Sequence, residues 1–254
     1  MNDALYKQLL KLIIQMKVSV IIPTYNRFKP LLCALESIKT QDYDNFEIIV
    51  INDNSSDQDY YTYDWQNINI IHLNETNCSR SKIGYPCVGY VRNIGIEKAT
   101  GDYIAFCDDD DCWLPNKLKI QMESLKQNPN CKMISSDGLI GNGIYDKNKK
   151  YKIYLKEHYF RSLQSIYKNK NSNLLDNGFP NIFNLDFLKI HNCMITSSVI
   201  IEKSLLNKIG NMPYTRRGQD YECWLKALEF TDSIYLKDEV LFYYDNLHAY
   251  GPNH

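Results

Sequence analysis

The sequence has no long hydrophobic run, no paired-cysteine motif and almost no net charge, and each absence argues against a class of protein. No apolar stretch approaches the ~20 residues that a transmembrane helix needs, so no membrane span is predicted. The formal net charge of −1 argues against a nucleic-acid partner and against a dedicated membrane-surface binder. We therefore expect a globular protein whose partners are small molecules or other neutral surfaces.

The eight cysteines are scattered, with no CxxC pair and no Cys/His spacing of the kind that binds zinc. Several lie inside apolar runs, where cysteine behaves as a small hydrophobic residue. Because no signal peptide is visible, this pattern predicts a reducing compartment and a cytoplasmic protein. A disulfide between Cys78 and Cys87, which share one predicted loop, is the alternative.

The length and the N-terminal pattern predict one domain behind a short extension. A chain of 254 residues suffices for one large α/β domain or two small ones. Leu5, Leu9, Leu12 and Ile13 recur at helical spacing, so residues 1–15 are predicted to be a helical extension. This helix could anchor at a membrane surface or pack on the domain or on a partner, which is compatible with a homo-oligomer.

The most informative stretch is residues 101–115, GDYIAFCDDDDCWLP. An apolar run from Tyr103 to Cys107 predicts a buried strand, and it ends at four consecutive aspartates, Asp108 to Asp111. Open α/β sheets bind ligands at the carboxyl edge of such strands. Adjacent carboxylates repel one another unless a cation neutralises them, and their hard oxygens suit Mg²⁺ or Mn²⁺ together with substrate phosphates. A solvated acidic turn is the alternative.

A βαβ unit is predicted at the start of the domain. Residues 18–22 and 46–51 are continuous apolar runs of the kind found in strands buried on both faces, and a helical pattern joins them. The first run ends in the polar turn 23–27 and the second is followed by Asp53, so polar groups gather again at a carboxyl edge. Asp53 by itself could equally form an Asx-turn or cap a helix. A third strand is predicted over 69–73.

The later chain gives weaker patterns. The remaining expectations are a glycine- and polar-rich loop over 74–90, a helix over 116–128, a strand over 132–136, a strand over 191–201 and a helix over 204–210. Residues 146–162, DKNKKYKIYLKEHYFRS, are basic and aromatic. This composition favours a solvated loop followed by a helix. The alternative is that the segment binds an anionic acceptor.

Several of these blocks, spread over residues 16–250, resemble the GT-A glycosyltransferases of the large inverting family 2. They include VSVIIPTYNR, FEIIVINDNSSD, VRNIGIEKATGDYIAF, GDYIAFCDDDDCW and RRGQDYECWLKALEF. The resemblance implies an α/β GT-A fold, in which a single domain has a mostly parallel nucleotide-binding sheet flanked by helices. It further implies a nucleotide-binding half over 16–113 and an acceptor-binding half over 114–250.

The resemblance assigns residues to the donor and to a metal. The implied contacts to the nucleotide sugar are Pro23, Thr24, Tyr25, Asn26, Arg27, Asp53, Arg92, Asn93, Asp108 and Asp109. The DxD-like run implies a metal, Mn²⁺ or Mg²⁺, at Asp110 and Asp108. His248, in an ending similar to the family's Tyr-Arg-x-His, is the further implied ligand, although here the arginine is missing and the spacing differs by one residue.

The resemblance also implies a general base. In the family a Glu-Asp pair precedes a helix, and its aspartate removes the proton of the acceptor hydroxyl. Here the pair is Gln219-Asp220, so the departure falls on the first position and the base would be Asp220. An aspartate at a helix start is often only an N-cap, which is the alternative.

The function that follows from the resemblance is inverting transfer of a sugar from a nucleotide sugar, most simply a UDP-sugar, to the hydroxyl of a glycan, lipid-linked or protein acceptor. Two alternatives stay open. A nucleotidyltransferase would share the acidic metal site but would carry a glycine-rich phosphate loop near the N-terminus, and no such loop is visible. A catalytically inactive GT-A domain that binds nucleotides or carbohydrates is the other.

Overall fold

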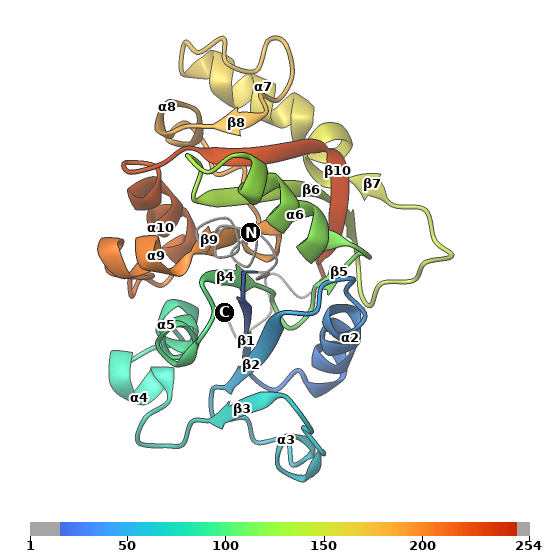
Figure 1. The fold of residues 1–254 in the computed structure, drawn as a ribbon, viewed down its shortest axis with the longest axis vertical. Helices are drawn as coiled ribbons and strands as arrows, with labels where there is room; N and C mark the ends of the chain where they lie inside the picture. The colour runs from blue at the N-terminus through green and yellow to red at the C-terminus, as the bar shows by residue number, and fades with distance from the viewer. Residues whose placement is uncertain (1–15, 248–254) are drawn as a thin grey trace, which may run out of the picture.

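The computed structural model describes residues 16–247, and its framework is one curved sheet with helices on both faces (Figure 1). The strand order is β3-β2-β1-β4-β9-β6-β10-β5, with β7 paired to β6 and β8 paired to β10. The strands are β1 Val18–Thr24, β2 Phe46–Asn52, β3 Asn69–His72, β4 Tyr103–Phe106, β5 Cys112–Trp113, β6 Met133–Gly141, β7 Lys152–Ile153, β8 Ile182–Phe183, β9 Ile200–Glu202 and β10 Ser233–Asp245.

The helices cover the two faces of this sheet. Their bounds are α2 Phe28–Lys39, α3 Asp59–Thr62, α4 Ser79–Ile83, α5 Val88–Lys98, α6 Lys117–Gln127, η1 Tyr154–Tyr159, α7 Phe160–Asn169, α8 Leu185–Leu188, η2 Thr196–Ser198, α9 Lys203–Ile209 and α10 Gln219–Ala227. In Figure 1, α5, α9 and α10 lie on one side of β1 and β4, and α2 lies on the other. Two hydrophobic clusters result, one packed by α5, α9 and α10 and the other by α2 and α6.

The first half of the sheet is parallel, as the βαβ pattern predicts. β1 pairs in parallel with β2 and β4, and β2 pairs in parallel with β3. Every residue of β1 is buried, because helices cover both of its faces. The carboxyl ends of β1, β2 and β4 therefore meet at one edge of the sheet.

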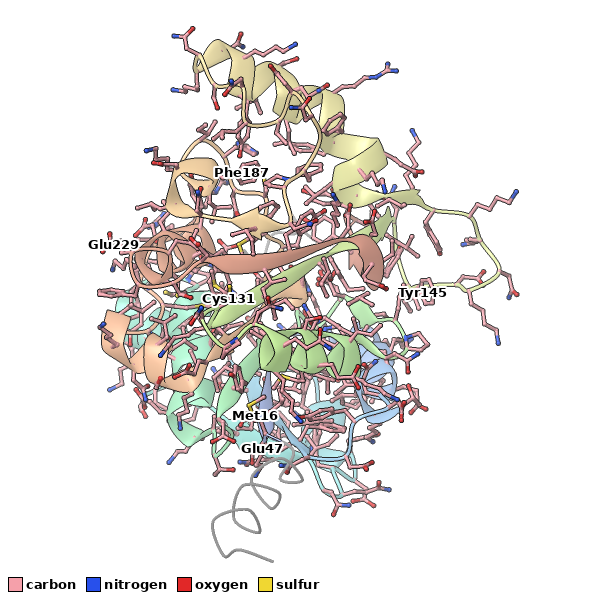
Figure 2. The ribbon with its side chains drawn as sticks, turned by 45° about the horizontal axis from the view of Figure 1, so that its top comes forward. Met16, Glu47, Cys131, Tyr145, Phe187 and Glu229 are labelled. Carbon is pink, nitrogen blue, oxygen red and sulfur yellow. The ribbon has the colours of Figure 1, made fainter. Side chains whose placement is uncertain are left out.

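The second half makes the sheet mixed. β9 lies between β4 and β6 and is antiparallel to both, whereas β10 runs parallel to β6 and antiparallel to β5. The predicted mostly parallel arrangement is thus confirmed for the strands of the first half, β1 to β4. Figure 2 places Glu47 of β2 and Phe187 of α8 toward opposite ends of the molecule, with β10 between them.

A close approach between α5 and the sheet brings the start of this helix to the edge described above. A Cβ at Gly95 would lie 2.6 Å from Cγ2 of Ile21 and 2.7 Å from Cδ1 of Ile51, so only glycine lets α5 pack this tightly on β1 and β2. Arg92 lies three residues earlier in α5, and residues three apart share a helix face. The packing therefore holds Arg92 against the strand ends.

Two sequence-based expectations about secondary structure are wrong. The predicted loop over 74–90 contains α4 and the first residues of α5, because a tertiary contact from Asp53 to Ser79 stabilises the start of α4. The strand predicted over 191–201 is reduced to β9, and the turn η2 occupies Thr196–Ser198 just before it.

Some expectations fall outside the described residues. Residues 1–15, predicted as a helical extension, and His248, implied as a metal ligand, both lie there. Between residues 16 and 247 no helix is long and apolar enough to cross a membrane. All eight cysteines are described and are free thiols, so the alternative pairing of Cys78 with Cys87 is wrong.

Candidate active site

A pocket opens where the carboxyl ends of β1, β2 and β4 face the amino ends of α5 and α10. It contains about 880 Å³ of space, its open mouth included, which falls within the range of small-molecule sites. Its lining residues are Pro23, Thr24, Tyr25, Arg27, Asp53, Arg80, Pro86, Cys87, Val88, Val91, Arg92, Asp108, Asp109, Thr196, Gln219 and Asp220. The pocket thus combines the strand-end residues with the start of α10, more than a hundred residues later in the chain.

The turn after β1 lines the pocket except at Asn26. The backbone of Asn26 is left-handed (φ 52°), and its amide donates to Oγ of Ser55 at 2.9 Å. Its side-chain Oδ1 accepts from the amide of Ser56, also at 2.9 Å. Asn26, predicted to contact the nucleotide, instead ties the β1 turn to the loop after β2 and so fixes the position of Tyr25 and Arg27.

Asp53 lines the pocket and is already engaged with α4. Its two carboxylate oxygens accept from the amide and the hydroxyl of Ser79, at 2.7 and 2.5 Å. The contact holds the first residue of a helix 26 positions later in the chain, whose N-cap is Cys78, so Asp53 is not the N-cap of this helix. Each carboxylate oxygen has a second lone pair, so Asp53 can still accept a ligand N–H.

Arg92 is the most constrained charged group of the pocket. It is 3 % exposed, and its Nη2 donates to Oδ1 of Asp108 at 2.5 Å. Its Nε and Nη1 are buried and have no hydrogen-bond partner among residues 16–247. Buried donors are normally satisfied, and an unsatisfied one costs about 1–3 kcal/mol, so these two nitrogens are an exception that calls for an explanation.

Asn93, the neighbour of Arg92, does not line the pocket. It is 5 % exposed, and its carboxamide exchanges two hydrogen bonds with the backbone of Met212, at 2.8 and 3.0 Å. The implied contact of Asn93 with the nucleotide has no support in this geometry. Asn93 instead joins α5 to the segment between α9 and α10.

The remaining aspartates of the run are held by one arginine and by the end of β10. Nη1 of Arg27 lies 3.2 Å from Oδ1 of Asp109 and 2.7 Å from Oδ2 of Asp110. Asp111 accepts from Oγ of Ser197 at 2.5 Å and from the amide of Asp245 at 2.9 Å. Asp108 and Asp109 line the pocket, whereas Asp110 and Asp111 do not.

The aspartates of this run are buried, and the neighbouring arginines do not neutralise all of their negative charge. Burial raises the pKa of Asp109 to about 6, even though Arg27 acts in the opposite direction. Burial and the neighbouring carboxylates raise the pKa values of Asp110 and Asp111 well above the ordinary aspartate value. The arrangement therefore favours the arrival of a cation. Within the described chain no three side chains of the metal-binding types form a cluster, so phosphate oxygens would have to complete the coordination.

Asp220 lines the pocket from the first turn of α10. The N-cap of this helix is Gly218, at φ 71°, so the alternative that Asp220 caps the helix is wrong. Oδ2 of Asp220 accepts from Oγ1 of Thr196 at 3.1 Å, which leaves lone pairs directed elsewhere. Gln219 beside it is 9 % exposed, and its Oε1 has no hydrogen-bond partner in the described structure.

Among the pocket residues that were not predicted from the sequence, two contact predicted ones. The guanidinium of Arg80 lies 4.6 Å from the ring centre of Tyr25, and Thr196 holds Asp220. Arg80 lies in what the sequence presents as an irregular loop, and Thr196 in what it presents as a strand. Neither has a local pattern that distinguishes it from a surface residue, so no signal could have identified them.

Comparisons with known proteins agree with this architecture. The model of the family described as Glycosyl transferase family 2 matches residues 19–184. A protein described as an "Uncharacterized glycosyltransferase" of Rickettsia bellii is 37% identical over 114 residues, which are 44% of this chain and 15% of that protein. The UDP-Glc:alpha-D-GlcNAc-diphosphoundecaprenol beta-1,3-glucosyltransferase WfgD of Escherichia coli is 25% identical over 84% of this chain and 70% of its own length.

The fold is also similar to solved structures. The crystal structure of S. aureus TarS 1-349 in complex with UDP-GlcNAc superposes with a TM-score of 0.63 at 22% identity, over 94% of this chain and 60% of that one. Several relatives are longer proteins, of which this chain spans only 15% to 37%. Since the family model matches more than half of the sequence and the sheet has the arrangement of GT-A neighbours, the chain belongs to glycosyl transferase family 2 and has the GT-A fold.

Proposed function

We propose that this chain transfers a sugar from a nucleotide sugar, most simply a UDP-sugar, to an acceptor hydroxyl, with inversion at the anomeric carbon. The observation that carries the proposal is Arg92, a pocket-lining residue whose guanidinium holds Asp108 and whose buried Nε and Nη1 have no partner among residues 16–247. A guanidinium presents paired donors that match the oxygens of a diphosphate. Both WfgD and the TarS complex are described with UDP-sugars, which supports uridine as the nucleoside.

The donor would occupy the strand-end side of the pocket. Asp53 would accept the ring N–H of uracil, which cytosine lacks, while Ser79 holds the carboxylate in place. Tyr25, Arg80 and the turn after β1 would enclose the nucleoside. Arg92 and Arg27 would then face the two phosphates.

A divalent metal, Mn²⁺ or Mg²⁺, fits this site. The four carboxylates of the run outnumber the two guanidinium groups that contact them, and their oxygens are the ligand type that both ions prefer. Asp108 of the pocket wall would hold the ion together with Asp110, which would have to exchange its contact with Arg27 for the metal. The chemistry that it would supply is neutralisation of the charge on the leaving diphosphate.

Asp220 would act as the general base. It would remove the proton of the acceptor hydroxyl while that oxygen forms a bond to the anomeric carbon, on the face opposite the diphosphate. The bond from the anomeric carbon to the phosphate oxygen breaks in the same step, and the nucleoside diphosphate leaves. The hydrogen bond from Thr196 would hold the carboxylate in the orientation that accepts this proton.

The direct test is release of nucleoside diphosphate from a panel of UDP-, GDP- and ADP-sugars, in Mn²⁺ and in EDTA. We expect release of UDP from at least one UDP-sugar in Mn²⁺ and much less in EDTA. Binding of UDP without release from any donor would favour the inactive binding module. Pyrophosphate formation from UTP and a sugar phosphate would favour a nucleotidyltransferase.

A further inference from the structure

The segment that leads into α10 has no backbone support of its own. Residues 211–218 join α9 to α10, and Asp220 follows them in the first turn of α10. Among residues 16–247, no backbone group of residues 212–217 is hydrogen-bonded to another backbone group. Asn211 and Gly218, at the two ends of the segment, have left-handed backbones with φ 61° and 71°. The position of Asp220 therefore depends on side chains that hold this segment.

Those side chains come from α5 and from the turn before it. The carboxamide of Asn93 donates to the carbonyl of Met212 at 2.8 Å and accepts from its amide at 3.0 Å. Asn93 is 5 % exposed and Met212 is 1 % exposed, so both bonds are shielded from water. The hydroxyl of Tyr85 donates to the carbonyl of Tyr214 at 2.7 Å. Asn93 thus contributes the two buried hydrogen bonds of this contact.

A glycine brings α5 into direct contact with the same segment. A Cβ at Gly89 would lie 2.6 Å from the carbonyl oxygen of Pro213 and 3.4 Å from Cβ and Cγ of Gln219. Gly89 and Asn93 are four residues apart, so they share one face of α5. This face therefore packs on residues 212–213 and on the residue that directly precedes the proposed base.

A neighbouring face of α5 belongs to the donor pocket. Arg92 directly precedes Asn93, lines the pocket and donates to Asp108. An α-helix is stiff over so few residues, because hydrogen bonds join its backbone groups one turn apart. The proposed diphosphate contact and the segment that carries the base are therefore attached to one rigid element.

General base catalysis depends on such a fixed relation. The base must lie within hydrogen-bonding distance of the hydroxyl proton while the anomeric carbon is held through the diphosphate. A misplacement of about 1 Å, caused by a change away from the reacting atoms, can lower a rate about 10²-fold. Thr196 orients the carboxylate of Asp220 through one hydrogen bond of 3.1 Å, but this bond does not fix the backbone that carries it.

We propose that Asn93 is a positioning residue for the base: it holds residues 212–218 on α5, so that Asp220 keeps its place relative to the donor diphosphate. The inference rests on the proposed function, because it adds a residue to the same reaction. Asn93 does not line the pocket and acts through the backbone of Met212.

The test is a double-mutant cycle of Asn93→Ala and Asp220→Asn, which separates a role through the base from a role in stability alone. The rate is kcat for UDP release, in Mn²⁺, from the UDP-sugar that the donor panel identifies. Asn93→Ala should lower kcat about 10- to 100-fold, because the base is misplaced. UDP affinity and the KM of the donor should stay within about twofold of the parent, because the donor contacts are unchanged.

The second arm of the cycle is decisive. In the Asp220→Asn background, Asn93→Ala should lower the remaining rate by less than about twofold, because the base through which it acts is absent. If the alanine variant does not fold, Asn93→Asp replaces it and is judged by the same criteria. Aspartate has nearly the shape of asparagine and loses only the bond to the Met212 carbonyl.

The control is Tyr43→Phe, which removes the hydrogen bond from a buried ring to the carbonyl of Met16. This bond lies at the amino ends of β1 and β2, the edge opposite the pocket, so the variant should be less stable but keep the parental kcat. Parental kcat in the Asn93 variant, or an equal fall in both backgrounds, would overturn the inference. Absence of UDP release by the parent from every donor would instead contradict the proposed function.

Discussion

The carboxylate of Asp220 is held by one hydrogen bond and takes no part in capping its own helix. Asp220→Asn should therefore preserve the fold, because the amide oxygen of asparagine can still accept from Thr196. It removes the basic oxygen, and general base catalysis contributes about 10²–10⁴-fold. We expect sugar transfer to fall by that order while UDP affinity stays unchanged. The measurements are initial transfer rates and calorimetric titration with UDP.

Glu222 gives the matched control for this substitution. It lies in the same helix, is exposed and does not line the pocket. Glu222→Gln should transfer sugar at the parental rate. An Asp220→Asn variant with near-parental transfer would make Asp220 a structural residue, and the search for the base would then move to Asp245.

Single residues also explain why some predicted contacts lie outside the pocket. Asn26 and Asn93 both stand at motif positions that the family uses. Yet the carboxamide of each is hydrogen-bonded to backbone groups of another segment. A carboxamide both donates and accepts, so it suits such bridging. The sequence pattern is the same whether the side chain faces a ligand or a neighbouring loop.

Among the elements, α6 begins with a buried cation. Lys117 is 0 % exposed, donates to Oε1 of Gln121 at 2.6 Å and lies 4.3 Å from the ring centre of Trp113. Burial lowers the pKa of Lys117 to about 7. The hydrogen bond and the ring offset part of the cost of burying the charge, and they attach α6 to the segment that follows the acidic run.

This burial predicts a specific pH dependence of stability. In the unfolded chain lysine titrates near pH 10.4, so between about pH 7 and pH 10 the unfolded state binds a proton that the folded state does not. Relative to Lys117→Met, the parent should therefore become more stable as pH rises through this window, by about 1.4 kcal/mol per pH unit. Below pH 7 the difference should be constant. Urea unfolding of the parent and of Lys117→Met, under reducing conditions and over this pH range, measures the difference in their free energies of unfolding.

The control is Lys119→Met in the same helix, where the lysine forms only a surface pair with Asp42. The free energy of unfolding of Lys119→Met should follow the parental pH profile. The two should differ at most by the small free energy that a surface ion pair contributes. If the Lys117→Met profile also runs parallel to the parent, Lys117 stays charged in the folded state.

At the scale of the whole molecule, the site joins elements from both halves of the chain through buried charge. A ligand that neutralises the acidic run should therefore stabilise the entire domain. At a UDP concentration of 100 times its dissociation constant, binding adds about 2.7 kcal/mol, or roughly 5–10 °C in melting temperature for a domain of this size. We expect this shift in Mn²⁺ and a much smaller one in EDTA.

Asp110→Asn should remove most of the difference between Mn²⁺ and EDTA, because Asp110 is a proposed ligand of the metal. Asp42→Asn, which changes an exposed carboxylate, should keep the full difference. Differential scanning fluorimetry with and without UDP gives all the values. Equal stabilisation by UDP in Mn²⁺ and EDTA would contradict a metal role for the run.

The sequence by itself determined the parallel half of the sheet and the position of the acidic run. Both follow from local patterns: short apolar runs make buried strands, and polar residues after them must lie at the carboxyl edge. The family resemblance added Arg92, Asp53 and Asp220, and all three line one pocket. Their roles in binding and catalysis stay predictions.

Only the tertiary structure decided which of these groups are available to a ligand. Arg27 engages Asp109 and Asp110, 82 and 83 positions away, and Ser79 engages Asp53 across 26 positions. Such partners are set by the packing of distant segments rather than by neighbouring residues. For this reason local patterns predicted the strands and their polar ends, but not the unsatisfied nitrogens of Arg92.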